Sequence, residues 1–565
     1  MAGGEKYTKW TISQVSRADG VSLDQYYWLP NSFQYAENVN TDDEMHGVKL
    51  SQKMSYSSGT LANNQLISAW NYVIALDKSS WTVKKFDENN WSSWWSATGS
   101  PSVTPGQAQS KWLTFCEWVI FQDHFWYGTW SWTMWGLVKL SVEGLTYTVI
   151  APSDHASSND EDIMDPEHLT GQMGAGITAI LNYNNSRLVV AVGQDLWVYY
   201  PELEAEYNAD KPDSEKELTW KVWWKKVMSF ENGSTIIALT CTFEYLKVWV
   251  QDEWWNTKVY YYQGNNNLKS TFVYNVIDLT GTKVLRVYSI NSIDYYVASL
   301  DGTDGYVTFN KMIGNTPVML LKQRAGLSAY DVNYKDPYFV WPCGMDAPYN
   351  GGNFYVADAY GIWKFQYDAT SYDKGYMKWN KGRKSAPSGV AVCKNFLYFT
   401  DQNWIYKVRL YDTGVDWYQD KWILISRELE GDYGGCVTKM LDEVRMHYEL
   451  LPEYQSSTGS GNGSIDIYVS PNNSWRNHDP ESDSTWRRHV MHIDGTNFRT
   501  RTEQINALNS VNAWAPAFEF DWQTLTYCIV IKNGSISQAT PIVRELRLQY
   551  QLKGKTNNIY EIQNS

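Results

Sequence analysis

Short apolar stretches alternate with polar turns along most of the chain, and within the stretches apolar residues recur with the two-residue period of β-strands. Beyond about residue 60, one pattern returns about every 40 to 60 residues: an apolar strand, a turn rich in Asp, Gly or Asn, and an aromatic strand. The clearest copies are 187–200, 353–365 and 395–408. The pattern predicts an all-β repeat protein.

Looser copies of the same pattern occur at 70–86, 112–140, 236–262 and 295–309, so the chain holds about seven units. A ring of four-stranded antiparallel blades leaves only short, protected edges, which keeps a long all-β chain soluble without helices. We therefore expect a β-propeller of about seven blades over residues 61–428, with six or eight blades as alternatives.

The two flanks lack this spacing. Residues 1–60 mix polar residues with isolated apolar ones, their only clear strand candidate is His46–Ser51, and we expect an extended N-terminal arm. Residues 429–565 alternate without the repeat, which predicts a C-terminal β-sandwich. Its expected strands are 437–450, 463–469, 486–493, 518–531 and 542–550, with a hairpin loop at 455–464.

Composition limits the partners. The 41 Tyr and 30 Trp favour half-buried pleated surfaces and recognition faces. The net charge of −14 argues against nucleic acid and anionic lipid as partners, because those surfaces attract clustered Lys and Arg. No segment is apolar enough to insert into a membrane, and residues 1–10 lack the apolar core of a secretion signal.

The six cysteines are Cys116, Cys241, Cys343, Cys393, Cys436 and Cys528. They are far apart and form no Cys-x-x-Cys pair, which fits reduced, partly buried thiols in a reducing compartment.

Candidate metal and catalytic groups are few. His489 and His492 are three apart, which on a regular strand places them on opposite faces and argues against a metal pair. The acidic stretch 159–167 lacks the glycine and terminal Glu of a helix-loop-helix calcium site, and 301–305 has the composition of a hairpin turn. We assign no metal ligand, no cofactor-binding residue and no catalytic residue, and leave the binding residues unknown.

Enzyme chemistry has no visible anchor in the sequence. Residues 482–486 faintly resemble the Asp-box turn of sialidases but lack its glycine, so we interpret them as a turn. No nucleophile elbow, phosphate loop or dinucleotide fingerprint occurs in a strand-turn-helix context. Two carboxylates from different blades could still converge in a propeller, so a glycosidase stays an alternative to the expected non-enzyme.

Residues 24–40, DQYYWLPNSFQYAENVN, followed by His46–Leu50, resemble the opening segment of tailed-bacteriophage virion proteins, ahead of their propeller. Residues 515–520, 525–532 and 540–550 are similar to the closing sandwich of the same proteins. The resemblance implies a structural component of the tail or of a tail-associated assembly. Its expected location is the virion, assembled in the host cytoplasm.

That role implies other virion proteins as partners and a homo-oligomer in a symmetric assembly, with the arm and sandwich docking neighbouring subunits and the propeller presenting a rigid face. A glycan-binding adhesin that recognises a host surface is the alternative from another class.

Several tryptophans follow Asn, Asp or Ser in turns that usually carry Gly: 403–404, 521–522, 90–91, 416–417 and 474–475. An indole tolerates positive φ poorly, so such turns would each carry strain of about 1 kcal/mol or more. One explanation is that the source reads UGA as Gly. The other is that the tryptophans are genuine and form stacking platforms for sugar rings. Intact mass distinguishes the two.

Overall fold

The computed structural model describes the strands and many of the turns of the chain. The described residues are 8–13, 33–40, 49–50, 55–58, 64–69, 71–77, 82–87, 94–96, 118–130, 135–141, 147–150, 177–201, 205, 209, 224–242, 245–264, 268, 271–300, 306–324, 344–347, 353–357, 361–366, 374–380, 389–401, 404–410, 421–430, 437–450, 464–486, 488–494, 510–516, 521–532 and 541–552. Every regular element among them is a β-strand, and every pairing is antiparallel, which confirms the expected all-β class.

Seven four-stranded sheets lie in the described part of the chain, and each is a run of neighbouring strands. The first three contain β6 (Asn64–Ala69), β7 (Tyr72–Asp77), β8 (Thr82–Asp87) and β9 (Trp94–Ser96); β10 (Trp118–Phe121), β11 (His124–Trp130), β12 (Trp135–Ser141) and β13 (Tyr147–Ile150); and β14 (Ile177–Tyr183), β15 (Arg187–Val192), β16 (Asp195–Tyr199) and β17 (Trp224–Ser229).

The next four sheets follow the same order. They contain β18 (Thr235–Cys241), β19 (Tyr245–Gln251), β20 (Thr257–Gly264) and β21 (Thr271–Leu279); β22 (Thr282–Ile290), β23 (Ile293–Leu300), β24 (Tyr306–Ile313) and β25 (Thr316–Arg324); β26 (Gly344–Asp346), β27 (Asn353–Ala357), β28 (Gly361–Gln366) and β29 (Lys374–Asn380); and β30 (Val390–Cys393), β31 (Phe396–Asp401), β32 (Trp404–Arg409) and β5 (Ser55–Ser58).

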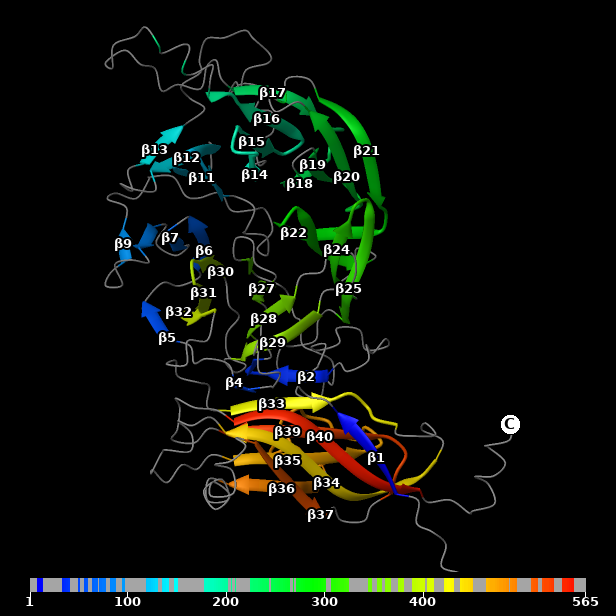
Figure 1. Ribbon diagram of the computed structural model, residues 1–565. Helices are drawn as coiled ribbons and strands as arrows, with labels where there is room; N and C mark the ends of the chain where they lie inside the picture. The colour runs from blue at the N-terminus through cyan, green and yellow to red at the C-terminus, as the bar shows by residue number, and fades with distance from the viewer. Residues whose placement is uncertain are drawn as a thin grey trace, which may run out of the picture.

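These sheets form the expected β-propeller, and Figure 1 shows them following one another around a ring. The first strand of one sheet lies beside the first strand of the next, as β14 lies beside β18 and β18 beside β22. Strand β30 lies beside β6, which brings the last sheet back to the first. In the last sheet the outermost strand, β5, comes from the N-terminal region, so both ends of the ring contribute to one sheet.

The repeat read from the sequence corresponds to the middle of each sheet. Its three clearest copies are the hairpins β15–β16, β27–β28 and β31–β32, and the looser copies fall in the other four sheets. Buried apolar runs explain their visibility, because β15 and β16 are buried along their whole length. Tight turns join strands elsewhere: Gln122 and Asp123 both have positive φ between β10 and β11, as a two-residue turn of the hairpin type requires.

The C-terminal unit consists of two sheets that share one hydrophobic core. One contains β1 (Thr8–Ser13), β40 (Pro541–Leu552), β34 (Lys439–Leu450), β37 (Ser510–Pro516) and β38 (Asp521–Trp522). The other contains β2 (Phe33–Glu37), β33 (Lys421–Ser426), β39 (Leu525–Lys532), β35 (Ser464–Pro471) and β36 (Arg488–Asp494). A separate short pair is β3 (Val39–Asn40) with β4 (Lys49–Leu50).

The pairing differs from the expected domain boundaries at both ends. The N-terminal arm is distributed over three sheets: β1 pairs with β40, β2 with β33, and β5 with β32. Strand β33, inside the expected 61–428 propeller, belongs to the C-terminal unit. The hairpin expected at 455–464 is wrong, since the flanking strands β34 and β35 lie in different sheets.

The propeller and the C-terminal unit share a continuous core. Strand β2 lies beside β29, and one hydrophobic cluster contains Tyr295 and Phe354 of the propeller, Phe33 and Tyr35 of β2, and Ile529 of β39. Tyr295 and Phe354 pack with ring centroids 4.8 Å apart. Apolar burial on both sides of β2 thus joins the two parts rigidly (Figure 1).

Candidate functional site

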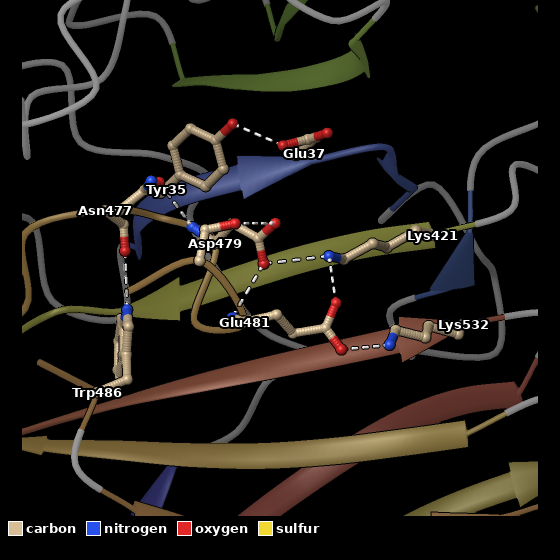
Figure 2. A network of polar contacts seen from close by, with 9 residues as sticks. Tyr35, Glu37, Lys421, Asn477, Asp479, Glu481, Trp486 and Lys532 are labelled. Carbon is tan, nitrogen blue, oxygen red and sulfur yellow. Dashed lines mark hydrogen bonds and ion pairs between the residues drawn. The ribbon is translucent and has the colours of Figure 1, made fainter. Parts of the chain in front are cut away.

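The main polar site lies on the C-terminal unit, where the segment 472–486 between β35 and β36 folds back over a sheet. Figure 2 shows Asp479 and Glu481 of this segment meeting Lys421 of β33 and Lys532 of β39. We call these four residues the clamp. Because β33, β39 and the segment are distant in sequence, only the folded sheet brings the four charges together.

Ion pairs connect the clamp. Lys421 Nζ lies 3.1 Å from Asp479 Oδ1 and 3.1 Å from Glu481 Oε2, and Lys532 pairs with Glu481. Burial alone would lower the pKa of Lys421, but the two carboxylates raise it overall. Burial would likewise raise the pKa of Asp479 and of Glu481, and the lysines hold both below their usual values. All four groups therefore stay charged near neutral pH.

A second carboxylate, Asp483, organises the segment internally. It accepts hydrogen bonds from the backbone N–H groups of Arg476 and Asn477, at 2.6 and 2.7 Å, and from the N–H of Thr485 at 2.8 Å. Burial would raise the pKa of Asp483, yet the hydrogen bonds from Thr485 and these backbone donors lower it overall. The turn expected at 482–486 is confirmed, with Asp483 as its acceptor.

Apolar contacts seat the same segment. Trp475 and Trp486 stack with ring centroids 5.6 Å apart and belong to the shared core. His478 stacks on Tyr35 of β2 at 4.5 Å, and Trp486 Nε1 donates to the carbonyl of Asn477 at 2.8 Å. The segment is thus a fixed part of the surface, held by core packing below and by ion pairs at its rim (Figure 2).

Buried carboxylates in the propeller serve the junctions between sheets. Asp294 of β23 is fully buried; its Oδ2 lies 2.7 Å from Lys247 Nζ and accepts from Thr240 Oγ1 at 3.1 Å, both in the preceding sheet. Burial raises the pKa of Asp294, and the Lys247 ammonium opposes the rise. Breaking such a pair leaves a buried charge unpaired, so this contact fixes the two sheets relative to each other.

Asp346 makes the equivalent connection two sheets further on. Its Oδ2 accepts from the backbone N–H of Val392 in β30 at 2.7 Å, and its Oδ1 accepts from Ala347 at 2.8 Å. Burial raises the pKa of Asp346 to about 6, although both hydrogen bonds oppose the rise. The two fully buried carboxylates of the propeller therefore each bond within a separate sheet junction.

The histidine pair is placed differently from our expectation. His489 pairs with Tyr468 and His492 with Asp466, because a β-bulge shifts the register between Ile467 and Tyr468. Their partners are two apart on β35, so the two positions lie on the same face of the sheet, not on opposite faces. Among the described residues, no group of three or more His, Cys, Asp or Glu could hold a metal ion.

Other candidate features have mixed outcomes. Cys241, Cys393 and Cys528 are free thiols, and the last two are buried, as expected. The acidic stretch 159–167, residues 301–305, Cys116, Cys343 and Cys436 lie outside the described residues. No helix in the described part is long and apolar enough to cross a bilayer.

The tryptophan turns are only partly as predicted. Trp475 and Trp522 are buried in the C-terminal core, and neither has a positive φ, so the strain expected there is absent. Residues 90–91, 403, 416–417 and the side chain of Trp404 lie outside the described part. A tryptophan that the sequence did not single out, Trp255 in the turn between β19 and β20, has a φ of 68°.

Sequence reasoning missed the clamp and both buried carboxylates. Lys421, Asp479 and Lys532 are scattered over about a hundred positions, and no local pattern relates them. The one usable signal was the run of Asn, Asp and Ser from residue 472 to 485, whose side chains favour self-bonded turns.

Comparison with known proteins adds a likeness in fold. No family model matches the chain, and no curated protein matches it. A chain of the Mitotic Checkpoint Complex is similar at 10% identity with a TM-score of 0.37, over 69% of this chain and 96% of that chain. The Vanderwaltozyma polyspora Nup133 β-propeller domain is similar at 10% identity with a TM-score of 0.38, over 66% and 99%.

A third similar structure is Kuenenia stuttgartiensis hydrazine synthase, at 10% identity with a TM-score of 0.39, over 63% of this chain and 97% of that chain. At such identities and scores the likeness concerns the fold alone.

Proposed function

We propose that this chain is a structural protein of a tailed-bacteriophage virion, part of the tail or of a tail-associated assembly. The observation that carries the proposal is the single core running from the propeller through β2 into the C-terminal unit, which makes the molecule one rigid body. Rigid parts suit an assembly whose subunits bind by buried area and avidity. The resemblance of 24–40, 515–520 and 540–550 to virion proteins supports the same role.

In this proposal the seven four-stranded sheets are the seven blades of a closed ring, and the C-terminal unit is a β-sandwich. The clamp and the 472–486 segment form part of the face that docks neighbouring virion subunits, because they present fixed charges of both signs. The protein acts as a scaffold, without catalysis or a cofactor.

Mass spectrometry of purified particles tests the role. We expect this chain among the virion proteins, in a fixed integer ratio to a tail protein. Its absence from particles that carry the other tail proteins would refute the proposal.

A glycan-binding adhesin is the second candidate, favoured by the turn between β19 and β20. Trp254 and Trp255 are 76% and 52% exposed there, and exposed indoles can stack on sugar rings. A glycan array probed with the full chain, with a Trp254→Ala variant as the control, distinguishes this role. Binding that the substitution abolishes would favour the adhesin.

A further inference from the structure

The outer edges of the propeller sheets are protected with one exception. In each sheet the last strand in the pairing order lies at the rim, and an open edge of this kind invites pairing with another chain. Strands β9, β13 and β5 have only three or four residues. The longer rim strands carry Lys, Arg or Pro: Lys225 and Lys226 in β17; Pro317, Lys322 and Arg324 in β25; Lys374 and Lys378 in β29.

Strand β21 is the exception. It has nine residues, no Lys, Arg or Pro, and a single charged residue, Asp278. Val273, Tyr274 and Val276 are exposed, which is half of the six large hydrophobic side chains that are exposed in the described part of the chain. A long, apolar rim strand without charged guards is typical of a surface that is covered in the working assembly.

The backbone of β21 is also open on its outer side. Among the described strands it pairs only with β20, and the N–H of Val276 donates to Oδ1 of the neighbouring Asn275 at 2.9 Å. The register shift at Tyr274 is no guard specific to this strand, since β17, β25 and β29 show similar shifts.

We propose that β21 pairs antiparallel with β21 of a second copy of this chain, forming a dimer with twofold symmetry. Full overlap centres the pair on Asn275, so Val273 falls opposite Ile277 and Tyr274 opposite Val276. Asp278 falls opposite position 272, not opposite the other Asp278, so pairing opposes no like charges. The strand is therefore complementary to itself, as a twofold interface requires.

The dimer should be weak in solution. One pair of strands buries less than the roughly 1,600 Å² of a standard stable interface, so association requires high concentration or additional contacts in a larger assembly. The inference does not depend on the virion role, because it rests on β21 alone.

Sedimentation equilibrium tests the dimer at chain concentrations up to the order of 100 μM, where weak pairs associate. We expect the natural chain and a Met319→Lys control to form dimers, and Val276→Lys to stay monomeric. Met319 on rim strand β25 is 48% exposed and Val276 is 42% exposed, so the two substitutions place the same charge on similar rim positions. A monomeric natural chain, or a Val276→Lys chain that dimerises as well as the control, would overturn the proposal.

Thiol cross-linking tests the register independently. In the proposed pair the two copies of residue 275 face each other, at about 5 Å between Cβ atoms, whereas the two copies of residue 278 lie about 20 Å apart. Under mild oxidation we expect Asn275→Cys to form covalent dimers above the level of the natural chain, and Asp278→Cys to stay at that level. Equal cross-linking of both variants, or of neither, would contradict the proposed register.

Discussion

Trp255 holds a bulky side chain in a left-handed backbone conformation, with a φ of 68°. An L-residue with a Cβ pays a steric cost of about 1–2 kcal/mol there, which glycine avoids. Asp252 fixes the turn by accepting from the N–H groups of Trp254 and Asn256, at 2.9 and 2.8 Å. Lys283 Nζ lies 3.4 Å from the Trp255 ring centroid and partly offsets the strain.

We expect Trp255→Gly to be more stable than Trp254→Gly by about 1 kcal/mol, because only residue 255 needs positive φ. Urea unfolding of the two single variants measures the difference. Equal stabilities would mean that the turn does not strain Trp255.

The same position bears on the decoding of the gene. If UGA is read as Gly in the source, the peptide containing residue 255, taken from the natural source, has the mass of a glycine-containing peptide. A peptide mass that matches Trp at 255 would count against that explanation and in favour of genuine aromatic platforms.

Asp346 predicts a measurable pH dependence. Its pKa is about 6 in the fold against an ordinary value of 3.8, so the folded state binds the proton more tightly than the unfolded state. Its contribution to stability is therefore full below about pH 4, falls as pH rises to about 6, and is constant above; the fall corresponds to about 3 kcal/mol.

In Asp346→Asn this contribution is absent, so the stability difference between pH 4 and pH 7 should change by about 3 kcal/mol relative to the natural chain. Chemical unfolding at several pH values measures it, and the change with pH is informative even if the substitution alters absolute stability. An unchanged pH profile would show that Asp346 ionises as freely as in the unfolded chain.

At the scale of elements, the 472–486 segment depends more on Asp483 than on the clamp. The clamp lysines and carboxylates are partly exposed, and such ion pairs contribute about 0–1 kcal/mol each. Asp483 instead satisfies three backbone donors of a turn, which makes it similar to a helix cap in its effect.

Asp483→Ala should therefore lower the free energy of unfolding by about 1–2 kcal/mol, because it leaves these donors without their acceptor. Ser484→Ala, at an exposed neighbouring position, is the matched control and should change it by less than about 0.5 kcal/mol. Thermal unfolding at pH 7 compares them. Since the pKa of Asp483 is lowered, the difference should disappear as pH falls through that lowered value. Equal effects of the two substitutions would assign the fixing of the segment to its tryptophans.

Most elements were predictable because their signal is local. Strands β15, β16 and β31 have buried apolar runs bounded by turns, and the sequence predicted them. Strands β1, β2 and β33 were missed or assigned to the wrong unit, because short strands completed by distant partners have no periodicity of their own.

At the scale of the whole molecule, the N-terminal region is a connector. Its strands β5, β2 and β1 complete a propeller sheet and the edges of both C-terminal sheets. Removing residues 1–60 would open three edges and expose part of the shared core.

We expect the chain lacking residues 1–60 to lose several kcal/mol of the roughly 5–15 kcal/mol typical of folded proteins, and to aggregate. Deletion of residues 1–7, which precede β1, is the control and should leave the unfolding transition in place. Calorimetry and size-exclusion chromatography report the outcome. A shortened chain with the natural melting temperature would show that the N-terminal strands add little.

The sequence by itself determined the all-β class, the propeller repeat and most strands, because two-residue periodicity and turn residues are encoded within a few neighbouring positions. Only the tertiary structure decided which strands complete which sheets, that β33 belongs with β39, and that Lys421 meets Asp479 and Glu481. These outcomes depend on contacts between residues far apart in the chain, and a local pattern carries no record of its distant partner.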